Sequence, residues 1–273
     1  MNIWLKRALV AIPVVVALFF GAILLYVNVI REDAPAQLGT EDLAAAVEGE
    51  APVASSPATS TPSSPAPTAS PSAAATASSS PVLTASVPVA TTVAGTDGAG
   101  PYDGTWTVTD ESEFGYRVEE VLFGVNTTAA GRSNQITGTM TIAGAAVTTA
   151  SFSVDVASIT SDDERRDTQF RGDVMDTEQF PEATFTLTAP IELGTVPADG
   201  QQVTATATGD LTLHGVTRSV TFDVTAQAAT DRIGVLGSIP ILFADYDIEN
   251  PYRSGITTED NGVLEFVLVF VPA

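Results

Sequence analysis

The sequence predicts an all-β C-terminal domain, an antiparallel barrel of about eight strands with one short helical crossover. Apolar and polar residues alternate with a period of two through much of residues 102–273, as in Val220–Thr225, where Val and Phe share one face. Thr and Val, which suit pleated surfaces, are abundant there. A tight link, Leu213–Thr217, joins two such segments as a hairpin, with Gly215 free to adopt a positive φ.

Eight strands are predicted near 104–110, 113–125, 134–143, 147–158, 182–192, 202–214, 217–229 and 262–271, with a further short strand near 233–243. The last strand places Leu264, Phe266, Leu268 and Phe270 on one face. Its other face is also apolar apart from Glu265, so both faces are expected to be covered. Such strands can close as a barrel or stack as a sandwich. We favour the barrel because closure removes exposed edges.

One region between the strands has helical character. Ser161 followed by Glu164 is a capping box, and the helix is expected to run to Arg171 and to end at Gly172. The segment 176–181 is predicted to form one further turn, which Pro181 terminates before the next strand.

The N-terminal 33 residues predict a cytoplasmic stub and a transmembrane helix. Residues 8–30 carry no charge, and about 20 apolar residues suffice to span a bilayer. Lys6 and Arg7 precede this stretch, so the positive-inside rule leaves the N-terminus cytoplasmic and the rest of the chain outside. The predicted location is the cell membrane, single-pass. A cleavable signal peptide ending at residues 34–36 is the alternative.

Residues 34–101 are predicted to be a disordered Pro/Ser/Thr/Ala-rich linker. Between residues 51 and 90 the chain holds eight prolines and few large apolar side chains. Such a composition does not offset chain entropy, and a flexible linker of this length reaches roughly 45 Å.

Charge excludes several kinds of partner. The full chain has a net charge of −22; residues 102–273 hold 8 Arg, no Lys and 26 Asp or Glu, a net charge of −18. Binding to nucleic acid, or to anionic lipid through a polybasic patch, requires clustered cations, so neither is expected. The chain has no cysteine, which excludes disulfides and thiol chemistry.

No catalytic constellation and no metal site are predicted. His214 is the only histidine and lies in a tight turn, where a packing role at the hairpin end is the simpler interpretation. Carboxylates cluster at 162–167 and 245–249, but neither cluster has the spacing of a calcium-binding EF-hand loop, and the first suits a helix N-terminus. An enzyme is therefore not expected.

Three ordered segments resemble the YceI-like family of extracytoplasmic lipid-binding proteins. They are Val154–Ile159 followed by Arg166 and Asp167, Met175–Pro181 running into Ala183–Phe185, and Gly209–Arg218. The opening residues 105–108 also suit the first strand of that family. The resemblance covers nearly all of residues 102–273.

The resemblance implies a lipocalin-like barrel whose apolar interior holds a long polyisoprenoid, such as a prenylquinone or a related lipid, with no cofactor. Together with the anchor, it implies a membrane-tethered carrier or buffer outside the cytoplasm. Three positions depart from the family pattern: Glu120 and Gln169 replace histidines, and Phe243 replaces an arginine. These departures leave tail binding intact and change the head-group region. The oligomeric state is not predicted.

The residues expected to line the cavity are inward aromatic side chains: Phe114, Phe123, Phe152, Phe170, Phe185, Phe222, Phe243 and Phe266. Such rings can equally fill an eight-stranded barrel. Small inward residues at 205, 207 and 209 favour a cavity. The candidates for the lipid head group or cavity mouth are Arg166, Asp167, Arg171 and His214. The alternative function is a non-enzymatic cell-surface interaction module with a filled barrel core.

Overall fold

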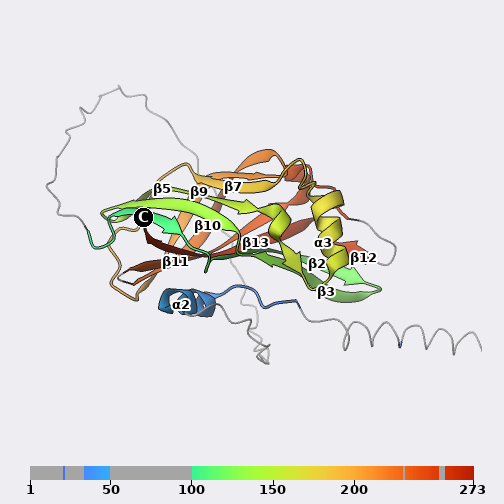
Figure 1. Ribbon diagram of the computed structural model, residues 1–273, viewed down its shortest axis with the longest axis horizontal. Helices are drawn as coiled ribbons and strands as arrows, with labels where there is room; N and C mark the ends of the chain where they lie inside the picture. Colours follow the sequence, from blue (N-terminus) through green and yellow to red (C-terminus); the bar gives the residue numbers. More distant parts are fainter. Residues whose placement is uncertain (1–20, 22–33, 50–99, 230, 252–255) are drawn as a thin grey trace, which may run out of the picture.

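The computed structural model describes residues 21, 34–49, 100–229, 231–251 and 256–273, and these form an all-β barrel with few helices (Figure 1). The strands are β1 Gly104–Val108, β2 Glu113–Leu122, β3 Val125–Ser133, β4 Ile136–Ala143, β5 Ala146–Asp155, β6 Thr160–Ser161, β7 Glu182–Leu187, β8 Ile191–Glu192, β9 Gln202–Leu213, β10 Val216–Ala229, β11 Arg232–Leu242, β12 Ile256–Thr258 and β13 Asn261–Pro272. The helices are α2 Thr40–Glu48 and α3 Glu164–Gln169, followed by a π-helical turn, η3 Phe170–Val174; short 3₁₀ turns are η2 Val156–Ser158 and η4 Phe243–Tyr246.

The predicted barrel of about eight strands is confirmed. Strands β1, β4, β5, β7, β9, β10, β11 and β13 form a closed antiparallel circuit, because β1 pairs with both β4 and β13. Inward residues of these strands form one continuous apolar core, which includes Trp106, Phe152 and Leu211. Closure pairs the edges of the circuit, as the sequence analysis expected.

A second layer of pairing extends the barrel at one end. β13 is long enough to pair with β1 through its C-terminal residues and with β2 through Val263–Val267. β3 continues outward from β2, and the two-residue strand β6 pairs with β3. The helical crossover formed by α3 and η3 lies beside this extension (Figure 1). We call this the mouth end of the barrel, and the opposite end, near Tyr102 and Gly144, the far end.

Several strand predictions were wrong in extent. The segment 182–192 was expected to be one strand, but β7 ends at Leu187 and β8 holds only Ile191–Glu192. The strand expected over 147–158 ends at Asp155 and continues as the 3₁₀ turn η2.

The segment 113–125 was expected to be one strand, but it turns sharply at Phe123 and Gly124, which both have positive φ, and returns as β3. No strand had been predicted over most of β3. The strand near 233–243 was expected to be short, whereas β11 pairs with β13 over ten residue positions.

The helical crossover forms at the predicted place but begins differently. Asp163 is the N-cap of α3, and its side chain accepts a hydrogen bond from the Arg165 amide at 2.8 Å. Ser161, the predicted cap, instead donates its hydroxyl to Asp167 at 2.7 Å. Gly172 does not end the helix but lies inside η3.

The link between β9 and β10 is the predicted tight hairpin. Leu213 pairs with Val216, and the two residues between them have positive φ, 49° at His214 and 76° at Gly215. The predicted turn at 176–181 is also present, because the Phe180 amide donates to the Asp176 carbonyl at 2.8 Å.

The described part of the predicted linker contains a helix. Residues 34–49, which we call the strap, lie along the outside of the barrel, and α2 packs on β11 and β13 (Figure 1). Leu43 and Ala46 are buried, as are Val267 and Val269 on the outer face of β13. The expectation that both faces of the last strand are covered is therefore confirmed, and the expected disorder is wrong for this segment.

A buried ion cluster fastens the strap. Glu265 on the outer face of β13 is only 1 % exposed and lies 2.7 Å from Arg132 and 3.5 Å from Arg117. Its other carboxylate oxygen accepts a hydrogen bond from the Leu38 amide at 3.2 Å. Arg117 and Arg132 also donate to the carbonyl groups of Pro35 and Ala36.

The predicted membrane span, residues 8–30, and most of the predicted linker lie outside the described residues. Among the helices in the described part of the chain, none has the length and apolar character needed to cross a bilayer.

Candidate ligand-binding cavity

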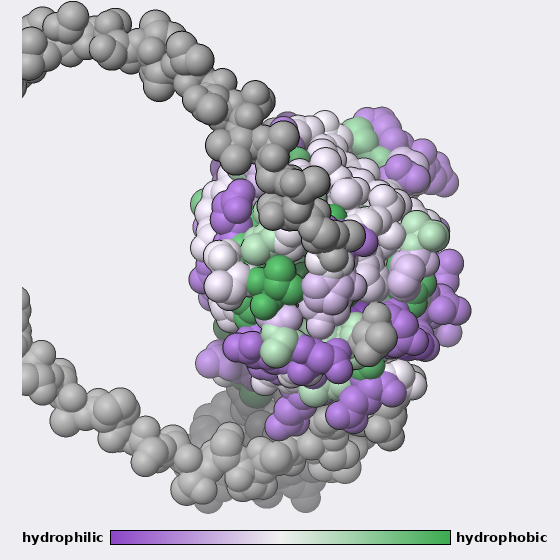
Figure 2. All heavy atoms as spheres, turned by 90° about the vertical axis from the view of Figure 1, so that its left-hand side faces the viewer, coloured by the Kyte–Doolittle hydropathy of each residue, from purple (hydrophilic) through white to green (hydrophobic). Residues whose placement is uncertain are grey.

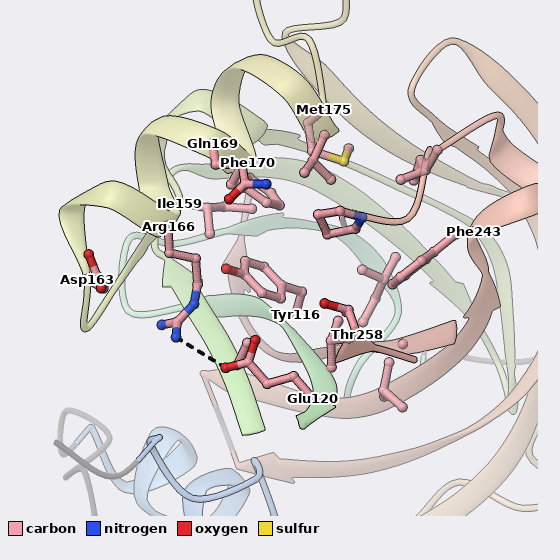
Figure 3. Close-up of a pocket in the computed structure, with 18 of the residues that line it drawn as sticks. Tyr116, Glu120, Ile159, Asp163, Arg166, Gln169, Phe170, Met175, Phe243 and Thr258 are labelled. Atoms are coloured by element: carbon pink, nitrogen blue, oxygen red, sulfur yellow. Dashed lines mark ion pairs between the residues drawn. The ribbon is translucent and has the colours of Figure 1, made fainter. Parts of the chain in front are cut away.

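A cavity of about 720 Å³ opens at the mouth end of the barrel. Its walls come from β2, α3, η3, β11 and the residues around β12, and most of them are apolar (Figure 3). The alternating residues of β2 all face it: Phe114, Tyr116, Val118, Glu120 and Leu122. Ligand sites in proteins commonly have this size and an apolar lining with a few polar groups.

The polar groups gather at the rim, beneath α3. Arg166 extends from α3 toward Glu120 on β2, with 3.6 Å between Nη2 and Oε1 (Figure 3). It also forms an ion pair with Asp162. Burial lowers the pKa of Arg166, but Asp162 and Glu120 outweigh that effect and raise it. The guanidinium is therefore charged, and its charge is already balanced by two carboxylates.

Tyr116 joins the rim to the apolar wall. Its ring stacks on Phe170 of η3, with 4.8 Å between centroids and 12° between planes. Burial raises the pKa of Tyr116 far above its ordinary value, and Asp167 acts in the same direction, while Arg166 opposes them. The phenol therefore stays neutral at physiological pH and can serve as a hydrogen-bond donor.

A cluster of five phenylalanine rings crosses the interior of the barrel. Phe152 lies at its centre, 5.4 Å from Phe185, 5.5 Å from Phe266 and 6.5 Å from Phe114 between ring centroids. Phe222 completes the cluster by contacting Phe185 and Phe266 edge-on. We call this cluster the phenylalanine septum.

A second, smaller cavity of about 100 Å³ lies at the far end. The two cavities share no lining residue: Phe114 faces the larger one, and the other four rings of the septum face the smaller one. The septum therefore divides the interior into two compartments. On the surface of the far end, apolar residues emerge only in separate patches between polar ones (Figure 2).

Glycines make room for the septum. A Cβ atom on Gly237 would lie 2.2 Å from the Phe266 ring, and one on Gly209 would lie 2.4 Å from the Phe185 ring. The small residue at 209 was interpreted as space for a ligand, but the space is taken by an aromatic ring. Ala205 and Ala207, predicted on the same grounds, line the smaller cavity.

The structure separates the eight predicted aromatic residues into groups. Phe114, Phe170 and Phe243 line the larger cavity, whereas the other four rings of the septum, Phe152, Phe185, Phe222 and Phe266, line the smaller one. Phe123 borders the larger cavity, but it was wrongly predicted to face inward. It occupies the β2–β3 turn with φ 50° and is 48 % exposed.

Of the four predicted head-group residues, the structure brings only Arg166 to the larger cavity. Asp167 is buried and accepts hydrogen bonds from the amide and hydroxyl of Ser161. Arg171 donates to the Ile159 carbonyl at 3.4 Å. These two side chains thus have partners in the short segment that precedes α3.

His214 lies away from the larger cavity, in the β9–β10 turn. Its Nδ1 is 3.1 Å from the Tyr246 carbonyl oxygen, and its ring meets Phe180 edge-on. These contacts agree with the packing role that the sequence analysis preferred. Within the described residues, no group of three or more His, Asp or Glu side chains is placed to hold a metal ion.

Sequence reasoning missed Tyr116, although the signal was present. The alternation that identified Phe114 places residues 116, 118, 120 and 122 on the same face of the strand. The three positions that depart from the family pattern, Glu120, Gln169 and Phe243, all line the larger cavity. All three departures thus change the lining of the larger cavity.

A family model described as the YceI-like domain matches residues 106–270. A UPF0312 protein of Vibrio parahaemolyticus is 35 % identical over 102 residues, which cover 35 % of this chain and 50 % of the relative. A UPF0312 protein of Pseudomonas fluorescens is 34 % identical over 128 residues, covering 44 % and 63 %. The chain thus spans about half of the length of the first of these relatives.

One solved structure shows the same fold at a TM-score of 0.50. A polyisoprenoid binding domain from Saccharophagus degradans, implicated in plant cell wall breakdown, superposes with a TM-score of 0.50 and 21 % identity, covering 62 % of this chain and 98 % of that domain. BcnA of Burkholderia cenocepacia gives a TM-score of 0.44 and 25 % identity, with coverage of 56 % and 95 %.

Proposed function

This chain belongs to the YceI-like domain family, and from that premise we propose that it binds one lipid with an isoprenoid tail in the larger cavity. In this proposal the protein is a membrane-tethered carrier or buffer that works outside the cytoplasm. The observation that carries the proposal is a cavity of about 720 Å³ with mainly apolar walls and polar groups confined to its rim.

The ligand class comes from the comparisons and the chemistry of the cavity together. The Saccharophagus domain, whose fold this chain shares, is described as polyisoprenoid binding. An apolar wall stabilises a hydrocarbon tail by about 0.8 kcal/mol for each buried CH₂ group. The rim offers a neutral phenol and a balanced ion pair, which can hydrogen-bond to a small polar head.

The charge at the rim favours a neutral head group. Five charged residues border the larger cavity: three carboxylates, Glu120, Asp162 and Asp163, and two guanidinium groups, Arg165 and Arg166. Arg166 is already paired with two of the carboxylates, and the five charged groups together carry a net charge of −1, so a pyrophosphate would meet net negative charge at the rim. A quinone head fits this rim better than a phosphorylated one.

The septum limits the length of tail that the cavity can hold. The smaller cavity offers only about 100 Å³, and four phenylalanine rings stand between it and the mouth end. A long tail would have to displace these rings or leave its end outside the mouth. We therefore expect tighter binding of short-tailed prenylquinones than of long-tailed ones.

A carrier of this kind exchanges its cargo close to equilibrium. The bilayer interior gives a prenyl tail the same hydrophobic gain as the cavity, so extraction brings little net free energy. Tethering to one membrane would confine the exchange to that surface.

The test is native mass spectrometry of the full chain, purified in detergent after incubation with liposomes that contain a short-tailed prenylquinone. We expect one bound quinone per chain. Ala183→Phe, which adds a ring inside the larger cavity, should abolish the adduct, and the matched Ala205→Phe change in the smaller cavity should not. Absence of any adduct, or its loss in both variants alike, would contradict the proposal.

The filled middle of the barrel favours one other function, the interaction module with a protein partner. Under that alternative the larger cavity would take up no lipid, and Ala183→Phe would leave binding of the partner unchanged. Family membership and the structural neighbours suggest a binding protein rather than an enzyme.

A further inference from the structure

The strap follows a defined path along the outside of the barrel. Its helix lies over the first residues of β11, where a Cβ atom on Gly234 would be 2.7 Å from Leu43. Toward its N-terminus the strap passes Glu265, which the Leu38 amide contacts, and reaches Arg117, which the Pro35 carbonyl contacts.

This path leads toward the mouth end. Gly234 lies near the start of β11, whereas the end of that strand, Ile241, lines the larger cavity. Arg117 lies on β2 five residues before Leu122, another lining residue of the same cavity. Figure 1 shows the strap running from α2 at the far end toward β2 and β3.

The strap shortens the connection to the predicted span. If the span ends at Ile30, the five residue steps to Pro35 reach at most about 18 Å. Along β2, the five residues from Arg117 to Leu122 cover about 17 Å. The docked strap thus allows the bilayer surface to lie at the level of the cavity mouth and keeps it within about 18 Å of Pro35, whereas a free linker would allow roughly 45 Å.

The rim of the mouth carries exposed apolar side chains. Three large apolar residues are exposed in the described part of the chain: Phe123 at 48 %, Leu242 at 53 % and Val196 at 38 %. Phe123 borders the larger cavity, and Leu242 lies between two residues that line it, whereas Val196 borders the smaller cavity at the far end. Single exposed apolar residues are ordinary on protein surfaces, but two of these three lie at the mouth, to which the strap leads.

We propose that the mouth rim, with Phe123 and Leu242, is a membrane-contact surface that the docked strap holds against the bilayer. This inference rests on the membrane attachment in the proposed function. It explains how a lipid could pass between bilayer and cavity without crossing water. It also assigns the strap a role in setting the orientation of the barrel.

The rim fits a bilayer with zwitterionic head groups. Glu119, Glu259 and Asp260 are exposed at this end of the barrel. Anionic lipids would repel these carboxylates at low salt, and the repulsion would weaken as the Debye length falls to about 8 Å at physiological ionic strength.

The absence of native cysteines makes a direct test simple. Phe123→Cys, Leu242→Cys and, as the far-end control, Val196→Cys would each carry a polarity-sensitive fluorophore on the full chain in phosphatidylcholine liposomes. We expect blue-shifted emission and quenching by nitroxide-labelled lipid at positions 123 and 242, and neither effect at 196.

Adding Leu43→Asp, which undocks α2, should return both rim labels to aqueous emission while the chain still sediments with the liposomes. Glu41→Gln, at an exposed position of the same helix, should leave the labels lipid-exposed.

Each contrary result has a separate meaning. Aqueous emission at all three positions in sedimenting protein would overturn the orientation proposed here and leave the anchor standing. Failure to sediment would overturn the anchor, and with it this inference, whereas binding of a quinone is measured independently by mass spectrometry. The emission of the rim labels could also shift to the blue with rising protein concentration without being quenched by nitroxide-labelled lipid. That result would show that a second copy of the chain covers the rim, and it would refute the proposal.

Discussion

Replacing Glu265 by Gln should destabilise the protein more than any other single removal of a charge on the outer surface of the barrel. Glu265 is 1 % exposed and is the shared carboxylate of Arg117 and Arg132, whose side chains are 16 % and 14 % exposed. Gln keeps the shape and can still accept a hydrogen bond from the Leu38 amide. The substitution thus removes only the negative charge, and it leaves the guanidinium groups of Arg117 and Arg132 without their shared carboxylate.

The expected cost follows from burial. Breaking a buried ion pair typically costs about 3–5 kcal/mol. Both arginines retain some contact with solvent, so we expect the lower end, about 3 kcal/mol. For a domain of this size, 1 kcal/mol shifts Tm by about 2–4 °C, so Tm should fall by about 6–12 °C.

Thermal and urea unfolding of the full chain in detergent would measure this cost. Glu113→Gln is the matched control, because Glu113 pairs with the same Arg132 at 3.2 Å but is half-buried at 25 % exposed, so solvent screens this pair more and its loss should cost only about 1 kcal/mol. Hydrogen exchange at the Leu38 amide should rise in Glu265→Gln alone. Equal effects of Glu265→Gln and Glu113→Gln on the free energy of unfolding would refute the reasoning. So would additivity in the double variant Glu265→Gln with Arg132→Met, that is, a loss of unfolding free energy equal to the sum of the two single losses.

Three further predictions follow from individual contacts. Gly237→Ala should cost about 1–3 kcal/mol in urea unfolding, because its Cβ would lie 2.2 Å from the Phe266 ring; an unchanged midpoint would show that the ring moves freely. Burial raises the pKa of Glu113 above its ordinary 4.5, with Arg132 opposing, so ionisation of Glu113 is less favourable in the folded state. The stability of the wild type relative to Glu113→Gln should therefore fall as pH rises through that pKa, and a rise would show the opposite shift. His214→Asn should lower Tm slightly by removing the contact with the Tyr246 carbonyl but leave quinone uptake intact; loss of uptake would place His214 in the ligand path.

The two ends of the barrel interior differ in packing. The septum, made of inward rings from β2, β5, β7, β10 and β13, supplies most of the aromatic packing that holds the sheet closed. The larger cavity at the mouth can then remain open at little cost to the core. This arrangement confines the loss of packing to the mouth end, because each cavity costs stability according to its volume.

The sequence identified the strands wherever alternation was strong, and it failed where polar and small residues interrupt the pattern. The strand Val125–Ser133 contains Asn126, two threonines, two alanines and Gly131, so it shows neither an apolar face nor a run of branched residues. The turn before it was hidden because Phe123, a residue typical of strands, takes a positive φ. The Gly124 that follows was the available signal.

The candidate site was only partly predictable for a related reason. Alternation shows that a phenylalanine faces inward, but it does not show whether that ring meets another ring or an empty space. Phe114 and Phe152 have equivalent patterns, yet one faces the larger cavity and the other lies at the centre of the septum. The head-group candidates Asp167 and Arg171 instead have hydrogen-bond partners in residues 159–161, just before α3, which spacing along the chain could not show.

By itself the sequence determined the class of fold, the family and the acidity of the domain, because these follow from local periodicity, short motifs and composition. The tertiary structure decided the division of the interior, the pairing of Glu265 with two arginines and the docking of residues 34–49. Each of these depends on contacts between distant parts of the chain, such as Leu38 and Glu265, which are 227 residues apart. The composition of a segment can predict disorder, but it carries no information about a surface elsewhere in the fold on which that segment can pack.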